Sequence, residues 1–145
     1  MTPYPHTYVV AAKAAPEGIV ALDSPGLSRL DSAPPEQFGG PGDQWSPETL
    51  LCAAVADCFV LTFRAVSRAS KFPWIGIECR TDAILDRVEG VSRFTVCTTS
   101  VVLTVPAGSD EAKAHLLLEK SEKGCLVANS LTAERRLEVR IVTAG

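Results

Sequence analysis

Two of the five cysteines in this 145-residue chain occupy positions where thiol chemistry is feasible. Cys58 lies inside an apolar segment with the composition of a helix, and Cys125 directly follows Gly124, a residue type that often ends helices. A thiol within a helix and a second thiol at a helix boundary can meet in the folded chain and cycle between dithiol and disulfide. This pair is the minimum requirement of a thiol-based peroxidase.

Thiol catalysis requires a thiolate, whereas a free cysteine with a pKa of about 8.5 is mostly protonated at neutral pH. A catalytic site must therefore supply positive charge or hydrogen bonds. Asp57 would oppose ionisation of Cys58 if both faced the same way, but consecutive helical residues point about 100° apart. Glu48 lies about 80° around the helix from Cys58, so the two can border one cleft. The carboxylate could hold an arginine there or accept a proton from a hydroperoxide.

Each of these residues also has a simpler interpretation. Free cysteine is among the most buried residue types, and a thiol on an apolar helix is more often a packing residue than a nucleophile. Glu48 alone is a favourable charge at a helix start, and Cys125 alone is a small apolar residue after a helix. The other three cysteines are predicted to be core or sheet residues: Cys52, Cys79 and Cys97.

Composition places the chain among soluble globular proteins, with 46% hydrophobic and 21% charged residues. The length fits a single domain over residues 1–145, and the net charge of −3 gives no basic field for nucleic acid. No secretory signal is recognisable at the N-terminus, so we expect a cytoplasmic protein. The apolar run Leu50–Phe63 is shorter than the roughly 20 residues of a membrane span. We expect neither a nucleic-acid nor a membrane partner.

Metal and cofactor sites are not expected. The cysteine number is odd, which argues against a disulfide framework, and no Cys-x-x-Cys pair occurs. His6 and His115 have no ligand spacing relative to each other.

The N-terminal third predicts a hairpin followed by a long loop. Two short strands, Tyr8–Ala12 and Gly18–Leu22, flank a turn. From Ser24 to Ser46 the glycines and prolines are too frequent for regular structure, and a loop of this length often covers a functional site. Ser46 can then cap a helix that Pro47 begins and that runs to about Ala69. Its first half is apolar on nearly every face, which predicts that other elements wrap it.

The remaining two thirds predict a long hairpin, a helix and a last strand. The strands Trp74–Val88 and Ser92–Val105 flank a turn at Glu89-Gly90. Pairing across this turn sets Val88 opposite Val91 and Cys79 opposite Ser100, while the facing of Cys97 stays open.

The second helix starts at Ser109-Asp110-Glu111 and ends at Gly124, with Ala112, Leu116 and Leu117 predicted inward and Ala114 as a further candidate. The last strand alternates Leu137, Val139 and Ile141 with charged residues.

The residues from Ser46 to Phe59 read SPETLLCAAVADCF. This run resembles the Asn-Pro-Glu-x-Leu-x-x-Ala-x-x-x-Cys-Phe signature of the OsmC/Ohr family. Gly39-Gly40 and the segment from Glu119 to Leu131 resemble the family's glycine-rich approach and its second-cysteine segment. The predicted order of elements is also similar to that of the family over nearly the whole chain.

The resemblance implies an α+β, OsmC-like fold: N-terminal antiparallel strands, a long buried central helix, a long β-hairpin, a second helix and a C-terminal strand. It implies an intertwined homodimer with two cysteine sites at the interface. It further implies that Cys58 attacks an organic hydroperoxide to give a sulfenic acid, and that Cys125 resolves it as a Cys58–Cys125 disulfide. A dithiol reductant, in this family often a lipoylated protein, would restore the thiols. Glu48 would position the site's arginine.

The chain departs from the family pattern at that arginine. Family members supply it from the N-terminal region, but the two positions expected from alignment hold Pro16 and Gln37, neither of which is basic. A cation within about 4–6 Å lowers an acidic group's pKa by about 1–3 units, so its loss would matter. Three residues are candidate substitutes: Lys13, Arg29 and Arg64.

Two alternatives stay open. The same scaffold could be a non-catalytic, OsmC-like dimer that binds a small molecule or lipid, a reading motivated by the missing arginine and by Asp57 beside Cys58. It could also be a structural dimer with incidental thiols. The family's Pro-x-Ser after the second cysteine is replaced by Leu126-Val127-Ala128, which predicts different packing of that segment.

Overall fold

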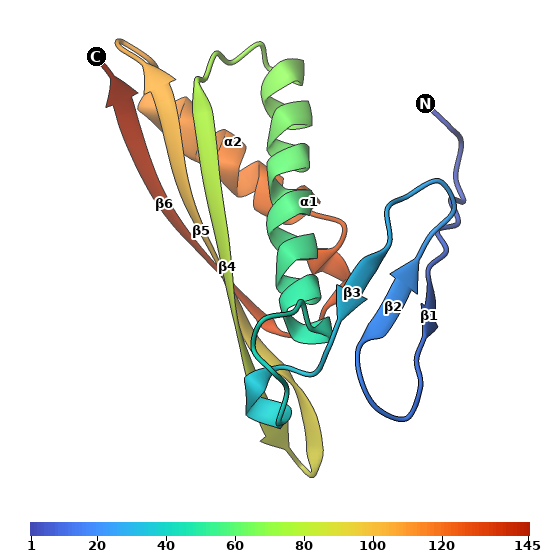
Figure 1. Cartoon of the computed structure of the whole chain (residues 1–145). Helices are drawn as coiled ribbons and strands as arrows, with labels where there is room; N and C mark the ends of the chain where they lie inside the picture. Colours follow the sequence, from blue (N-terminus) through green and yellow to red (C-terminus); the bar gives the residue numbers. More distant parts are fainter. The chain divides into compact units, whose positions relative to one another are not determined.

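The computed structural model describes all of residues 1–145, which form helices and two three-stranded sheets (Figure 1). In chain order the elements are β1 (Ala11–Lys13), β2 (Val20–Asp23), β3 (Leu30–Ser32), the 3-10 helix η1 (Glu36–Phe38), α1 (Pro47–Ala69), β4 (Gly76–Val88), β5 (Val91–Pro106), α2 (Glu111–Gly124), the 3-10 helix η2 (Ala128–Ser130) and β6 (Glu134–Ala144). The α+β prediction is confirmed. The chain divides into two compact units, Met1–Leu51 and Cys52–Gly145. A single domain over the whole chain stays a prediction.

The first unit holds an antiparallel sheet in the order β1-β2-β3. The predicted hairpin is present, but its strands begin two to three residues later and end one residue later than expected, with Ala12 opposite Leu22. The expectation of no regular structure between Ser24 and Ser46 is wrong, because β3 and η1 form within it. The physical reason is the placement of the glycines and prolines: none occurs between Gly26 and Pro34, so β3 has an uninterrupted stretch in which to pair with β2.

Helix α1 begins where the sequence predicts. The Ser46 hydroxyl accepts a hydrogen bond from the Thr49 amide at 3.1 Å, and the Thr49 hydroxyl accepts one from the Ser46 amide at 2.9 Å. Two amide donors that the helix itself cannot satisfy are thereby paired. The capping residue, Ser46, directly precedes Pro47, the first residue of the helix.

One stripe of α1 is buried in the single chain, at four-residue spacing: Val55, Phe59, Phe63 and Ser67. The expectation that neighbouring elements wrap the first half of this helix is wrong for one chain. Ala54, for example, is exposed. By length and composition alone, α1 could cross a membrane, but the core helices of soluble proteins often have the same length and composition. The fully buried Phe59 and Phe63 place it in the core of the second unit.

The second unit holds a sheet in the order β4-β5-β6, in which β4 pairs antiparallel and β6 pairs parallel with β5 (Figure 1). Val88 lies opposite Val91 as predicted, but Cys79 lies opposite Val101 instead of Ser100. The cause is a β-bulge between Ile84 and Leu85, which leaves one residue of β5 unmatched and shifts the register beyond it.

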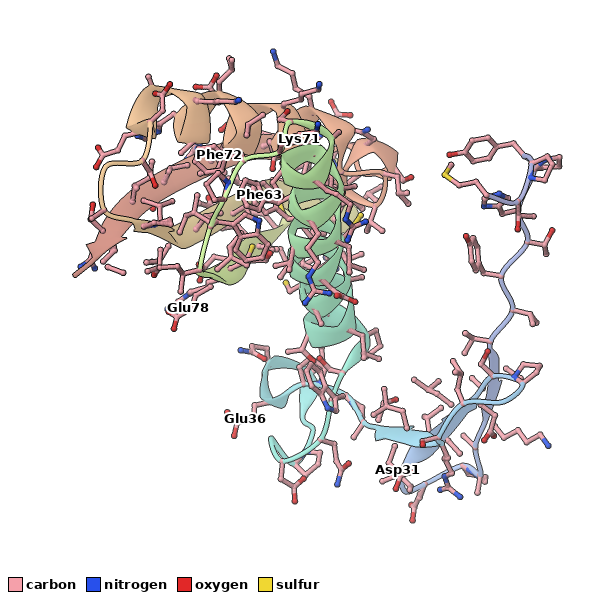
Figure 2. The ribbon with its side chains drawn as sticks, turned by 90° about the horizontal axis from the view of Figure 1, so that it is seen from above. Asp31, Glu36, Phe63, Lys71, Phe72 and Glu78 are labelled. Carbon is pink, nitrogen blue, oxygen red and sulfur yellow. The ribbon has the colours of Figure 1, made fainter.

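The two helices share one face of this sheet. Alternate residues of β5 from Cys97 to Val105 are buried, and Val101, Leu103 and Val105 pack in one core with residues of α1 and α2. Phe63 and Phe72 lie beside α1 on the side of α2 and the sheet (Figure 2).

Helix α2 is capped by the Asp110 carboxylate, which accepts a hydrogen bond from the Lys113 amide at 3.0 Å. Its buried residues are Ala114, Leu117, Leu118 and Ser121. The prediction was right for Leu117 and wrong for Leu116, which is 63% exposed, and for Ala112. The stripe that faces the sheet is rotated by about one residue from the predicted one.

Candidate active site

Cys125 lies immediately beyond the C-terminus of α2. Its amide donates to the Glu122 carbonyl at 3.4 Å, and its side chain is completely buried. The end of α2 packs closely on α1 at this point. A Cβ on Gly124 would stand 3.4 Å from the Thr62 methyl group, which is van der Waals distance, so the end of α2 lies directly against α1.

Cys58 lies on α1, one turn before Thr62. The Thr62 hydroxyl donates to the Cys58 carbonyl at 2.7 Å and stands 4.0 Å from the Cys58 sulfur. The Cys58 side chain is only partly buried in the single chain, whereas its neighbour Asp57 is exposed. A small molecule can therefore reach the Cys58 thiol more easily than the Cys125 thiol.

The structure brings Cys58 and Cys125 together. Both belong to one apolar cluster: Cys125 is one of its buried members, with Val55 and Cys97, and the partly buried Cys58 packs against this group. The Cys125 thiol points at the carbonyl oxygen of Val55, which lies one turn before Cys58 on α1. The distance from the sulfur to this oxygen is 3.9 Å. The two thiols are close enough that a hydrogen bond with Cys58 affects the ionisation of Cys125. The two cysteines predicted for the site thus share one cluster.

The Cys125 thiol is held in its protonated form. Burial, the neighbouring Cys58 thiol and the Glu122 carboxylate together raise its pKa to about 11, with burial the largest cause. The Ala128 amide hydrogen-bonds the sulfur and opposes this shift. At neutral pH the reduced site therefore keeps Cys125 as a neutral thiol.

The other three cysteines face the same helix-sheet interior. Burial raises the pKa of Cys79 to about 11, with smaller contributions from Cys125 and Glu122. Burial also raises the pKa of Cys97, and Cys52 lies near enough to add to that shift. No group of His, Cys, Asp and Glu side chains is arranged to hold a metal ion.

Glu48 occupies the first turn of α1 in the first unit. Its Oε1 atom is buried and has no hydrogen-bond partner. Buried carboxylate oxygens are seldom left without a donor, so this atom offers an acceptor to a cation. Of the candidate substitutes for the missing arginine, Arg29 pairs with Asp31 at 2.8 Å, and Arg64 lines a cavity of about 390 Å³ with Phe72 and Trp74. Lys13 lies on β1 and is exposed.

The sequence analysis missed Arg135, on β6. Its Nε donates to the Glu122 carboxylate at 2.8 Å and its Nη1 to the Asn129 side-chain oxygen at 2.6 Å. Its Nη2 donates to the Glu122 carbonyl. Only 26% of the Arg135 side chain and 17% of that of Glu122 are exposed. This half-buried ion pair therefore lies beside the segment that carries Cys125.

Comparison with known proteins agrees with this arrangement of helices and strands. The family model for OsmC-like proteins matches residues 40–140. The chain belongs to the OsmC-like family. Proteins of this OsmC/Ohr family are generally dimeric and act on hydroperoxides, and the family includes peroxidases.

Curated relatives are similar over most of the chain. The chain is 28% identical over 116 residues to the uncharacterized protein YmaD of Bacillus subtilis, and the aligned region covers 77% of each protein. It is 28% identical over 96 residues to peroxiredoxin OsmC of Escherichia coli, and the aligned region covers 66% of each protein.

Solved OsmC-like structures share the fold at low identity. An OsmC-like protein of unknown function from Vibrio cholerae has a TM-score of 0.84 at 14% identity, over 94% of this chain and all of that one. The organic hydroperoxide resistance protein OhrB of Bacillus subtilis has a TM-score of 0.70 at 22% identity, over 93% and 98% of the two chains. These similarities establish the OsmC-like fold. The chemistry has to be inferred from the residues of the site.

Proposed function

We propose that this chain is a thiol peroxidase that reduces organic hydroperoxides, with Cys58 as the nucleophile and Cys125 as the resolving thiol. The observation that carries the proposal is the contact of a partly accessible Cys58 with a fully buried Cys125 in one cluster. The peroxiredoxin name of the Escherichia coli relative and the hydroperoxide resistance name of OhrB support it.

In the first step the Cys58 thiolate attacks the terminal oxygen of the hydroperoxide. The O–O bond breaks, the alcohol leaves after taking up a proton, and Cys58 becomes a sulfenic acid. In the second step the Cys125 sulfur attacks the Cys58 sulfur, the S–O bond breaks and water leaves. The result is a Cys58–Cys125 disulfide. A dithiol reductant, such as a lipoylated protein, returns two electrons and two protons and is itself oxidised to a disulfide.

The division of roles follows from accessibility. A peroxide must reach the attacked thiol, and Cys58 is the partly exposed member of the pair. The resolving thiol needs only to reach the Cys58 sulfur, so complete burial of Cys125 is compatible with its role. Glu48, with its unpaired buried oxygen, is suited to hold a cation. We place the reaction in a cytoplasmic homodimer.

Single-turnover measurements with cumene hydroperoxide test the proposal. Cys58→Ser should abolish peroxide consumption. Cys125→Ser should consume one equivalent and accumulate a sulfenic acid that dimedone traps. Cys52→Ser, on the same helix, is the matched control and should behave like the wild type. Multiple turnovers by the Cys58→Ser protein would exclude this mechanism.

A second candidate is a non-catalytic OsmC-like dimer that binds a small molecule or lipid. It is favoured by the immediate contact of the Cys58 thiol with the neutral Thr62 hydroxyl. Alkylation of Cys58 by iodoacetamide as a function of pH distinguishes the two candidates. An ordinary thiol pKa near 8.5 would favour binding, and a lowered one would favour catalysis.

A further inference from the structure

Arg135 belongs to the buried row of β6. Along this strand the odd-numbered residues from Arg135 to Ile141 are partly buried, and the even-numbered ones are exposed. A charged side chain in a buried row requires partners, because its desolvation is otherwise uncompensated. The guanidinium meets this requirement with three hydrogen bonds, to the Glu122 carboxylate, the Glu122 carbonyl and the Asn129 side chain. The guanidinium makes them from three separate nitrogens in one plane, a spread of donors that the single nitrogen of an ammonium does not have.

These partners lie on either side of Cys125 in the chain. Glu122 precedes it in the last turn of α2, and Asn129 follows it in η2. The segment is also bonded internally: the Asn129 amide donates to the Cys125 carbonyl at 2.9 Å, and the Asn129 side chain donates to the Lys123 carbonyl at 3.1 Å. Arg135 therefore ties both ends of the Glu122–Asn129 segment to β6 and leaves Cys125 between them.

The position of this segment decides which thiol meets Cys58. The cluster around Cys58 contains a second buried thiol, Cys97, besides Cys125. A disulfide needs its two sulfurs about 2.05 Å apart with a defined dihedral angle, so the resolving cysteine must be held within a narrow range. A surface ion pair would not provide this, but a half-buried pair with three bonds to one segment does.

We propose that Arg135 is a positioning residue for disulfide formation, which holds the Glu122–Asn129 segment so that Cys125 faces Cys58. The inference rests on the proposed function, because it assigns Arg135 to the second step of that reaction. In this step the Cys125 sulfur forms a bond to the Cys58 sulfur, the S–O bond of the sulfenic acid breaks, and the Cys125 proton leaves with the hydroxyl as water. Arg135 does not contact the peroxide, and the first step does not depend on it.

Arg135→Gln tests this, with Arg136→Gln as the matched control. Arg136 is the next residue on β6, but it faces outward and pairs with Glu134, with about 60% of each side chain exposed. Each protein is mixed with one equivalent of cumene hydroperoxide. Peroxide loss and dimedone-reactive sulfenic acid are followed in time. For Arg135→Gln we expect peroxide loss within about twofold of the wild type and a sulfenic acid lifetime at least tenfold longer. Arg136→Gln should match the wild type in both.

Arg135→Lys separates position from charge. It keeps the charge but loses the three separate donor nitrogens, so the sulfenic acid lifetime should fall between those of the wild type and Arg135→Gln. If Arg135→Gln fails to fold, as judged by circular dichroism, Asn129→Ala removes one of the three contacts and should lengthen the lifetime in the same direction. A wild-type lifetime in Arg135→Gln, or in Asn129→Ala when it must serve instead, would overturn the inference.

A redox titration makes the result independent of peroxidase activity. In dithiothreitol buffers of varied ratio, the disulfide fraction of Cys58 and Cys125 is measured by alkylation and mass spectrometry. We expect the equilibrium constant for this disulfide to fall at least tenfold in Arg135→Gln and to be unchanged in Arg136→Gln. If the wild-type protein does not consume hydroperoxides but the equilibrium constant is still lower in Arg135→Gln, the proposed function is refuted and the positioning role is supported. Equal constants in all three proteins would refute the positioning role alone.

Discussion

The raised pKa of Cys125 predicts that disulfide formation accelerates steeply with pH. Attack on the Cys58 sulfenic acid requires the Cys125 thiolate, because the anion is the nucleophile in thiol chemistry. Burial and the neighbouring Cys58 and Glu122 keep the pKa of Cys125 at about 11. The resolving thiol is therefore almost entirely protonated at neutral pH, and each rise in pH increases the reactive fraction.

The size of the effect follows from this value. With a pKa of about 11, roughly one Cys125 in ten thousand is a thiolate at pH 7 and roughly one in a hundred at pH 9. The rate of sulfenic acid loss should therefore rise about tenfold per pH unit, or about a hundredfold between pH 7 and pH 9. The rise should continue toward pH 11.

The assay is a two-step mixing experiment. The reduced protein reacts with one equivalent of cumene hydroperoxide at pH 7, is jumped to the chosen pH, and is quenched with dimedone at intervals. Cys125→Ser is the control, since its sulfenic acid cannot be resolved by this route. A disulfide that depends on Cys125 but forms at the same rate at pH 7 and pH 9 would refute the reasoning. It would mean that the proton is removed within the site during attack.

Three further predictions concern stability. Phe63→Ala, at a fully buried core position, should lower the free energy of unfolding in urea by about 3–5 kcal/mol. Gly40→Ala should destabilise by about 1–3 kcal/mol, because its Cβ would lie 1.6 Å from the Pro34 carbonyl oxygen. The control Gly76→Ala, which meets nothing within 4 Å, should not destabilise through a clash. The pKa of Cys79 is raised from 9.0 to about 11 in the folded chain. As pH rises, the unfolded chain therefore loses this proton at a lower pH than the folded chain does. Cys79 should account for roughly 1–2 kcal/mol of the stability that the reduced protein loses between pH 9 and pH 11, after allowance for its partial exposure, and Cys79→Ser should remove that part of the loss.

The elements that carry the cysteines could be predicted from local signals. The Ser46 cap and Pro47 fix the start of α1, and α2 ends at Gly124 as predicted, so the positions of Cys58 and Cys125 within their elements follow from short-range signals. The proximity of the two thiols depended on the family resemblance. Spacing within single helices says nothing about which helices pack together.

Arg135 was missed although its signal was present. Leu137, Val139 and Ile141 alternate along β6, and extending this alternation backwards places Arg135 in the same buried row. Arg136, one position on, belongs to the outer row. A charge predicted on a buried row requires a partner, and that requirement points to the acidic and amide groups beside Cys125. The family resemblance predicts a cation that comes from the N-terminal region and serves Cys58. The observed ion pair instead lies on β6 and α2, beside Cys125.

The bulge in the β4–β5 hairpin could also have been inferred from a conflict between two signals. Counting from the Glu89-Gly90 turn puts Ser100 opposite Cys79, and directly opposite residues face the same side of a sheet. That register would bury Ser100 and Thr98 and expose Val101 and Leu103. Since apolar residues belong in the core, one extra residue had to lie between the turn and Cys97. The observed bulge between Ile84 and Leu85 supplies it. It turns Cys97 inward, into the cluster that contains Cys58 and Cys125.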